Sequence, residues 1–358
     1  MTLQTALTRR LNIDHPIIQA PMAGGGDTPE LVAAVCEAGG LGFIGGAYLN
    51  AEQITQAAAA VKARTQRPFG INLFAPLPAP STVATEVALE RVAAYYAELG
   101  LQPPSPPTAS VLPFEEQLEA GLASGAVVFS FTFGLPPEHA LAAIKDRGML
   151  LVATATTIEE AVTLERAGCD AIVAQGSEAG GHRGTFAAAF EQAMVGTMAL
   201  VPQMVDAVSV PVIASGGIMD GRGLVAALAL GAQAVQMGTA FLTCDEAGVA
   251  DAYKAAIVGA SARETKITRA FSGRPARGIV NRFMSEVEPD GSLDAVLPFP
   301  LQNALTRPLR TAAAMQGRAE FLSLWAGQGL TLARRQGAAA LMARLVADAE
   351  QTLRRLSG

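Results

Sequence analysis

A histidine and an arginine lie together in a glycine-rich segment that directly follows a short apolar run. His182 and Arg183 belong to residues 175–184, with the sequence QGSEAGGHRG, and residues 171–174 before them are apolar. Glycine lets the backbone approach a flat or anionic ligand closely, and an imidazole exchanges a proton near neutral pH. We therefore expect His182 to be a catalytic residue, acting as a base or as a donor to an anion.

Four other segments place glycine, hydroxyl or amide groups at the ends of apolar runs. Side-chain amides can both donate to and accept from the edge of a planar ring system. Backbone N–H groups in glycine-rich loops after late barrel strands commonly hold a phosphate. Together they suggest a flavin mononucleotide (FMN), for which the candidate residues are Pro21, Met22, Ala23, Asn72, Gln175, Gly180, Gly181, Ser215, Gly216, Gly217, Gln236, Met237, Gly238 and Thr239.

The elements that must position these residues alternate along the first two thirds of the chain. Eight apolar runs predict strands at residues 16–19, 41–45, 69–73, 127–131, 150–153, 171–174, 211–214 and 234–236. Helical patterns separate most of them, at residues 28–38, 51–64, 114–123, 137–146, 157–167, 197–208 and 221–230. Such alternation requires parallel pairing with right-handed crossovers, and eight units close a (β/α)8 TIM barrel. The sequence therefore predicts an α/β fold of this class.

Two regions interrupt the alternation. Residues 75–113 are proline-rich around one helical stretch, 85–99, and form an excursion after the third strand. From about residue 245 onward the chain reads as helices without clear strands. We expect residues 1–244 to form the FMN-binding barrel, 245–312 a helical substrate cap, and 313–358 helices that pack back on the barrel.

Composition excludes several classes of function. The 358 residues are 50% hydrophobic and 16% charged, which is typical of a globular enzyme, and the net charge of −6 provides no basic face for nucleic acid. No apolar run reaches the roughly 18 residues of a membrane span. The three cysteines have neither metal-ligand nor redox-motif spacing. We expect a cytoplasmic enzyme without a metal, either a monomer or a homodimer.

The sequence allows two interpretations for each of two side chains in the glycine-rich segment. Arg183 is either a partner of substrate or phosphate, or an ion-pair partner of Glu178. Glu178 is either a second active carboxylate or the acceptor of a structural hydrogen bond. The sequence contains no Ser-His-Asp pattern and no nucleophile elbow, so hydrolase chemistry has no support.

The motifs together resemble the class I nitronate monooxygenases, formerly called 2-nitropropane dioxygenases. The resemblance covers nearly the whole chain and is carried by residues 19–25, 38–42, 72–74, 175–184, 211–218, 236–239, 271–277 and 321–329. It implies non-covalent FMN and oxidation of alkyl nitronates by O2 to a carbonyl compound and nitrite, with some nitrate, without NAD(P)H. Propionate 3-nitronate is the implied substrate, and His182 matches the active-site histidine of the family. Where some relatives carry a second histidine, this chain has Thr132.

The resemblance leaves the substrate's carboxylate without an assigned partner. Four arginines are candidates: Arg183, Arg274, Arg277 and Arg307. Two other functions share the barrel motifs. One is an NAD(P)H-dependent flavin reductase of enoyl thioesters or quinones, and the other is a flavin-free lyase or isomerase that binds a phosphorylated metabolite.

Overall fold

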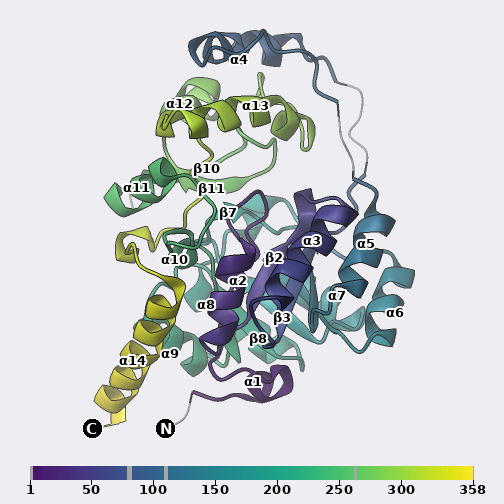
Figure 1. The fold of residues 1–358 in the computed structure, drawn as a ribbon, viewed down its shortest axis with the longest axis vertical. Coiled ribbons are helices and arrows are strands. Elements are labelled where there is room, and N and C mark those ends of the chain that lie inside the picture. The colour runs from purple at the N-terminus through teal and green to yellow at the C-terminus, as the bar shows by residue number, and fades with distance from the viewer. Residues whose placement is uncertain (1–2, 79–82, 109–111, 262–263, 358) are drawn as a thin grey trace.

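Eight parallel strands form a closed barrel at the centre of the computed structural model, which describes residues 3–78, 83–108, 112–261 and 264–357 (Figure 1). They are β1 (Ile17–Gln19), β2 (Gly42–Gly45), β3 (Phe69–Phe74), β4 (Val128–Thr132), β5 (Leu150–Ala155), β6 (Ala171–Gln175), β8 (Val212–Ser215) and β9 (Ala234–Met237). The hydrogen-bonded order is β1-β9-β8-β6-β5-β4-β3-β2. A parallel bridge between Ile18 and Leu41 joins the two ends, so the predicted (β/α)8 barrel is confirmed.

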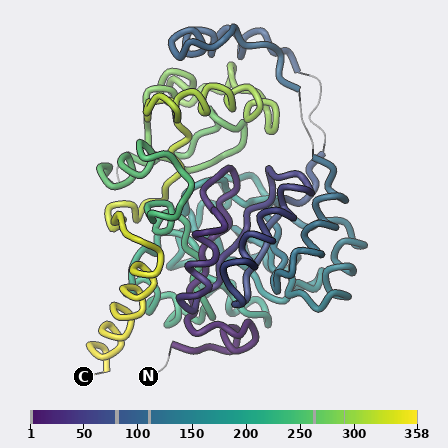
Figure 2. The backbone as a smooth tube through the Cα atoms, viewed as in Figure 1, coloured from purple at the N-terminus to yellow at the C-terminus, as the bar shows by residue number. Residues whose placement is uncertain are grey.

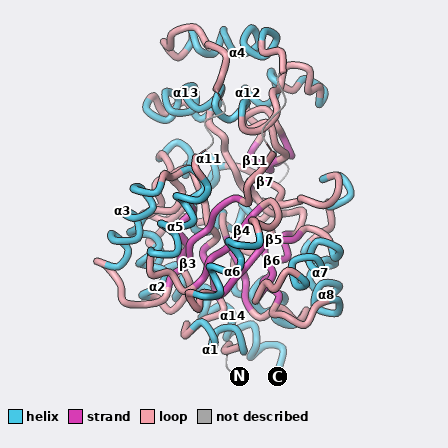
Figure 3. Tube along the Cα trace, turned by 90° about the vertical axis from the view of Figure 1, so that its right-hand side faces the viewer, coloured by secondary structure: helices cyan, strands magenta, loops and turns pink. Residues whose placement is uncertain are grey.

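Seven helices surround these strands (Figure 3). They are α2 (Pro29–Glu37), α3 (Ala51–Lys62), α5 (Phe114–Ala123), α6 (Glu138–Asp146), α7 (Ile158–Arg166), α8 (Thr197–Ala207) and α9 (Gly221–Ala229). Five of them are followed by a glycine with left-handed backbone, and φ is 81° at Gly39, 85° at Gly125, 68° at Gly148, 88° at Gly168 and 97° at Gly231. A short helix, α1 (Ala6–Leu11), packs Leu7 and Leu11 into the apolar interior of the barrel. It lies at the end of the barrel opposite to the carboxyl ends of the strands.

A second, smaller sheet lies above the barrel, and it corrects the expectation of helices alone beyond residue 245. It contains β7 (Gly181–His182), β10 (Thr265–Thr268) and β11 (Ala276–Ile279), all antiparallel. His182 pairs with Ala276, so the glycine-rich segment after β6 is tied to the sheet. The strands escape sequence analysis because all three are short, because β10 and β11 contain charged residues, and because β7 pairs with β11 across about ninety positions.

Four helices lie above or beside this sheet and share a separate apolar core, with α4 outermost (Figure 1). They are α4 (Glu86–Glu98), α11 (Asp251–Gly259), α12 (Arg282–Val287) and α13 (Leu301–Met315). The excursion after β3 thus sends α4 to the top of the molecule (Figure 1). There the Tyr95 ring lies 5.2 Å from that of Phe283, and the Tyr96 hydroxyl donates to the Leu305 carbonyl. The small sheet and these four helices form the cap, which therefore combines two distant parts of the chain.

The last helix, α14 (Ala338–Ser357), runs down the outside of the barrel towards the end where α1 lies (Figure 2). It packs against α9 so closely that a Cβ atom on Gly221 would collide with the backbone of Asp348 and Ala349. No helix in the described part of the chain has the length and apolar character needed to cross a lipid bilayer.

Candidate active site

His182 is held by a serine that the sequence did not single out. Its Nε2 atom lies 2.9 Å from the Ser272 hydroxyl oxygen. That hydroxyl donates to the carbonyl oxygen of Arg274 at 3.0 Å, and a carbonyl can only accept. The single serine proton is thereby used, so Nε2 of His182 carries a proton and donates it to Ser272. Nδ1 is left as the unprotonated, basic nitrogen, and no described residue hydrogen-bonds to it.

The imidazole lies in an aromatic enclosure formed by three separate segments. Ring centroids of Phe133, Phe299 and Trp325 lie 5.9, 6.3 and 5.7 Å from that of His182. Burial, together with the positive charges of Arg274 and Arg310, lowers the pKa of His182 from 6.5 to about 3. His182 is therefore uncharged at neutral pH and available as a base.

Phe133 has a backbone conformation that is rare for a bulky residue. Its φ is 75°, in the left-handed region that normally favours glycine. This conformation places its ring edge-on to His182, with the Arg274 guanidinium carbon 3.7 Å from the ring centroid. Strained backbone of this kind clusters at functional sites. Phe133 follows β4, so it lies at the same rim as the other loops.

Two arginines give the site a positive potential. Arg274 donates to the Thr185 carbonyl, and Arg310 donates to the Asn303 carbonyl and side-chain oxygen at 3.1 and 2.7 Å. Nε of Arg310 is buried without a partner. Burial lowers the pKa of each guanidinium to about 10, so both remain charged at neutral pH. Neither forms an ion pair within the described residues, and Arg310 had not been identified from the sequence.

The other three candidate arginines lie elsewhere or are already engaged. Arg183 is 1% exposed, and its Nη atoms donate to three backbone carbonyls, which fixes the loop after β6. Arg277 donates through Nε to the Ser177 carbonyl. Arg307 is exposed on α13. Arg274 is thus the one sequence candidate that lies beside His182, and Arg183 and Arg277 serve as structural residues.

Two polar residues of the loop after β6 have structural partners. The Glu178 carboxylate accepts from the Thr197 backbone N–H at 2.9 Å and from its hydroxyl at 2.9 Å, at the start of α8. These contacts are structural hydrogen bonds, one of the two interpretations of Glu178 that the sequence allows. The Gln175 side chain donates to the His182 carbonyl at 3.0 Å and accepts from Gly184 N–H at 2.8 Å. Gln175 therefore holds β7 in place, and its contact with a ring edge stays a prediction.

The remaining candidate residues converge on one rim, because they follow the carboxyl ends of parallel strands of one barrel. Gly216 and Gly217 have φ of 119° and 71°. Gly180 packs against Ala326 and Gly327, and Gly327 N–H donates to the Thr239 hydroxyl oxygen at 3.0 Å. The C-terminal segment thus closes over the loops after β6 and β9. Also at this rim are Ser215, Met237 and Gly238.

The loop after β1 is fixed by a carboxylate that sequence reasoning missed. Oδ2 of Asp27 accepts from Met22 N–H at 2.8 Å and Gly45 N–H at 2.7 Å. Burial raises the pKa of Asp27 to about 7, against the lowering effect of these hydrogen bonds. Met22 N–H is therefore used internally, and Pro21 and Ala23 on either side of it are half-buried. Asp27 follows three glycines in the sequence, and this position is the signal that could have identified it.

The chain matches one protein family along nearly its whole length. The model of the nitronate monooxygenase family matches residues 4–348. A probable nitronate monooxygenase of Staphylococcus saprophyticus is 42% identical over 99% of this chain and 100% of its own length. One of Staphylococcus aureus (strain Newman) is 42% identical over 97% of this chain and 98% of its own length.

Two solved structures are similar along their whole length. A nitroalkane oxidase from Streptomyces ansochromogenes superposes with a TM-score of 0.91 at 42% identity, covering 98% of this chain and 100% of that one. FabK from Thermotoga maritima has a TM-score of 0.77 at 31% identity, covering 100% and 99%. The chain therefore belongs to the nitronate monooxygenase family and is a flavin-dependent oxidoreductase.

Proposed function

We propose that the enzyme binds FMN at the rim of the barrel and oxidises alkyl nitronates with O2 to a carbonyl compound and nitrite, without NAD(P)H. The proposed natural substrate is propionate 3-nitronate. When bound, FMN accepts the electrons that the nitronate supplies. The observation that carries the proposal is an uncharged imidazole, His182, flanked by Arg274 and Arg310, whose charges no described carboxylate pairs with.

The residues at the rim fit a flavin. The backbone N–H groups of Gly216, Gly217 and Gly238 and the hydroxyl of Thr239 would hold its phosphate, since a Cβ atom on Gly238 would have only Ala20 within 4 Å. This open space beside the backbone suits close approach of an anion.

The ring edge has its own candidate partners. Asn72 donates to the Ser130 hydroxyl at 2.8 Å, and its Oδ1 has no partner among the described residues. The half-buried Gln236 side chain likewise has none. Asn72 is buried and Gln236 half-buried, and amide groups without a partner in such positions favour a polar ligand. Both would contact the isoalloxazine edge.

The charges of the site match a substrate with two negative groups. Propionate 3-nitronate carries a nitronate and a carboxylate. A guanidinium binds an oxyanion through charge-assisted hydrogen bonds, and two of them lie close enough to His182 to lower its pKa. We assign the nitronate end to His182 and Arg274, and the carboxylate end to Arg310, because Nε of Arg310 lacks any partner in the described structure.

A neutral nitroalkane would need one further step before oxidation. Nδ1 of His182 would take the proton from the carbon next to the nitro group, which leaves a nitronate anion and an imidazolium. The transfer forms an imidazolium–nitronate ion pair from two neutral groups, and the positive charges of Arg274 and Arg310 stabilise the new anion.

A steady-state assay tests the proposal against the NAD(P)H-dependent alternative. The purified enzyme is supplied with FMN and propionate 3-nitronate, and O2 consumption and nitrite are measured with and without NADH. We expect nitrite at the same rate in both. A dependence on NADH, or NADH oxidation with an enoyl thioester and no nitrite from the nitronate, would contradict it.

A further inference from the structure

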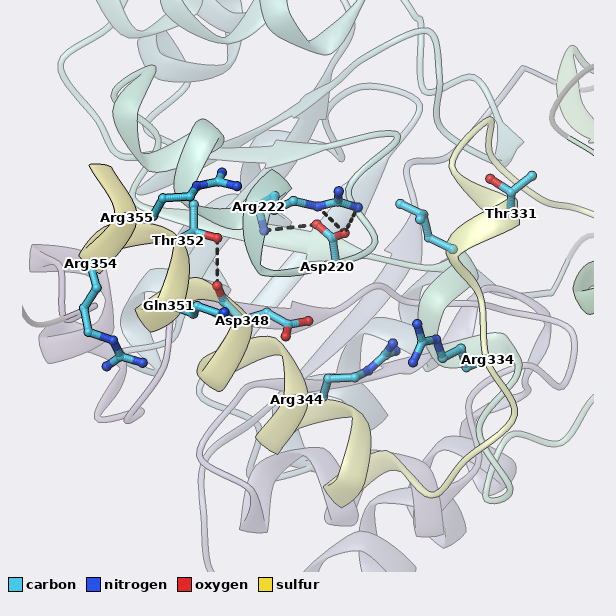
Figure 4. Close-up of a pocket in the computed structure, with 11 residues that line it drawn as sticks. Asp220, Arg222, Thr331, Arg334, Arg344, Asp348, Gln351, Thr352, Arg354 and Arg355 are labelled. Carbon is cyan, nitrogen blue, oxygen red and sulfur yellow. Dashed lines mark hydrogen bonds and ion pairs between the residues drawn. The ribbon is translucent and has the colours of Figure 1, made fainter. Parts of the chain in front are cut away.

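A hollow of about 630 Å³ lies on the outer side of the barrel, away from His182 (Figure 4). Its walls are the start of α9, the segment that follows η6 (Leu330–Leu332), and α14. The charged residues that line it are Asp220, Arg222, Arg334, Arg344, Asp348, Arg354 and Arg355. Five arginines thus face two aspartates in a chain whose net charge is −6.

Three of these arginines are accounted for by ordinary structural roles. Arg222 pairs with Asp220 through Nε at 2.8 Å. Arg354 lies 3.7 Å from the Glu350 carboxylate one turn earlier on α14. Arg355 is in the last turn of the same helix, where a cation is favoured by the helix dipole.

Arg334 and Arg344 have no such explanation. Neither guanidinium has a hydrogen bond or an ion pair with any described residue, and Nε of Arg344 is buried without a partner. Their side chains extend towards one another across the hollow (Figure 4). Two like charges that face each other repel, and a buried donor without a partner costs free energy. Both penalties are removed when an anion lies between them.

The walls of the hollow are held rigidly. The backbones of α9 and α14 touch at Gly221, where a side chain would collide with Asp348 and Ala349. A site whose sides are fixed loses little entropy when a ligand binds. Neutral hydrogen-bonding groups from Thr331 and Gln351 complete the lining.

We propose that Arg334 and Arg344 form a binding site for a phosphate group, either free or at the end of a small ester. The planar fork of arginine matches phosphate oxygens with two parallel hydrogen bonds, and two forks suit a dianion. The site is independent of the proposed oxidation, because it lies on a different face from His182 and shares no residue with the rim.

Calorimetric titration of the FMN-loaded enzyme tests this site, with excess FMN present so that any phosphate site for the flavin is filled. Inorganic phosphate and glycerol 3-phosphate are the two probes, at constant ionic strength adjusted with chloride. We expect saturable binding of at least one probe to a single site. Tighter binding of glycerol 3-phosphate identifies an ester as the ligand, and equal or tighter binding of inorganic phosphate identifies the free ion.

Variants locate the binding. Arg334→Gln and Arg344→Gln should each weaken it by about tenfold or more, the effect of losing a charged hydrogen bond. Arg335→Gln is the matched control, because Arg335 is the next residue and pairs with Asp251 outside the hollow. Arg334 is exposed, so its replacement leaves the fold intact. Absence of saturable binding of either probe, or equal affinity in all three variants, would overturn the proposal.

Discussion

Nε2 of His182 lies 2.9 Å from the hydroxyl oxygen of Ser272, whose own proton is directed at the Arg274 carbonyl. The serine connects β7 to the cap segment that carries one of the two site arginines. It therefore determines both where the imidazole lies and which of its nitrogens is basic. A serine in this role acts through the histidine and is a positioning residue.

Ser272→Ala should lower kcat on a neutral nitroalkane by about tenfold, the value of one hydrogen bond to a group that becomes charged. Ser272→Thr, which keeps the hydroxyl, should restore much of it. The effect on a preformed nitronate should be smaller, because that substrate needs no proton removal. An equal loss with both substrates would mean that the serine supports the fold rather than the base.

His182→Asn should retain FMN but lose about 10²–10⁴-fold in kcat on neutral nitroalkanes, the usual contribution of a general base. His139→Asn is the control, because His139 is exposed and its Nε2 lies 3.1 Å from the Glu115 carboxylate. Flavin absorbance establishes that cofactor binding is retained, and initial rates measure the loss. Unchanged rates in the His182 variant would remove the imidazole from the mechanism.

The low pKa of His182 has a consequence for the pH profile. Because the imidazole is already uncharged, kcat/KM on a neutral nitroalkane should show no acid limb near pH 6.5, and the decline should lie towards pH 3. The unfolded chain binds the proton with a pKa of about 6.5, so this histidine should lower stability as pH falls from about 6.5 to 3. His182→Asn should flatten that part of the stability curve. A decline in kcat/KM centred near pH 6.5 would show that the imidazole is exposed to solvent.

Arg310→Gln should raise KM for propionate 3-nitronate by about 10–100-fold, since a charged hydrogen bond to the carboxylate is lost. Ethyl nitronate has no carboxylate, and its KM should change little. Arg307→Gln is a matched control from the same helix, with an exposed side chain. If Arg307→Gln instead raised KM for propionate 3-nitronate selectively, the carboxylate would be assigned to Arg307, one of the candidates from the sequence.

Gly217→Val should weaken FMN retention, because φ is 71° and the new Cβ would lie 3.2 Å from that of Glu178. Gly317→Val is a control for backbone strain alone. Its φ is 68°, and a Cβ there meets nothing within 4 Å. The dissociation constant for FMN, measured by fluorescence, should rise only in the first variant. Equal affinities would place the phosphate at another loop.

The barrel was predictable because each of its strands is a continuous apolar run followed by a helix with its own end signals. Gly39, Gly168 and Gly231 mark three helix ends with the backbone that only glycine adopts easily. Local sequence carries this information directly. The loops at the strand ends then follow from topology, since parallel strands share one carboxyl rim.

The cap and several residues around His182 depend on contacts that local sequence does not encode. β10 and β11 contain Lys266 and Arg277, so their apolar pattern is weak. Arg307 and Arg310 are three residues apart on α13, and only the packing of that helix decides which one approaches the site. The left-handed backbone of Phe133 has no sequence signal either, because φ values of this kind are expected at glycine.

Anaerobic rapid mixing is the most direct test of how the flavin is reduced. FMN-loaded enzyme is mixed with propionate 3-nitronate in one experiment and with NADH in another, and loss of flavin absorbance is followed. We predict rapid bleaching by the nitronate and none by NADH on the timescale of turnover. Rapid bleaching by NADH and none by the nitronate would contradict the account, because the enzyme would then take its electrons from NADH.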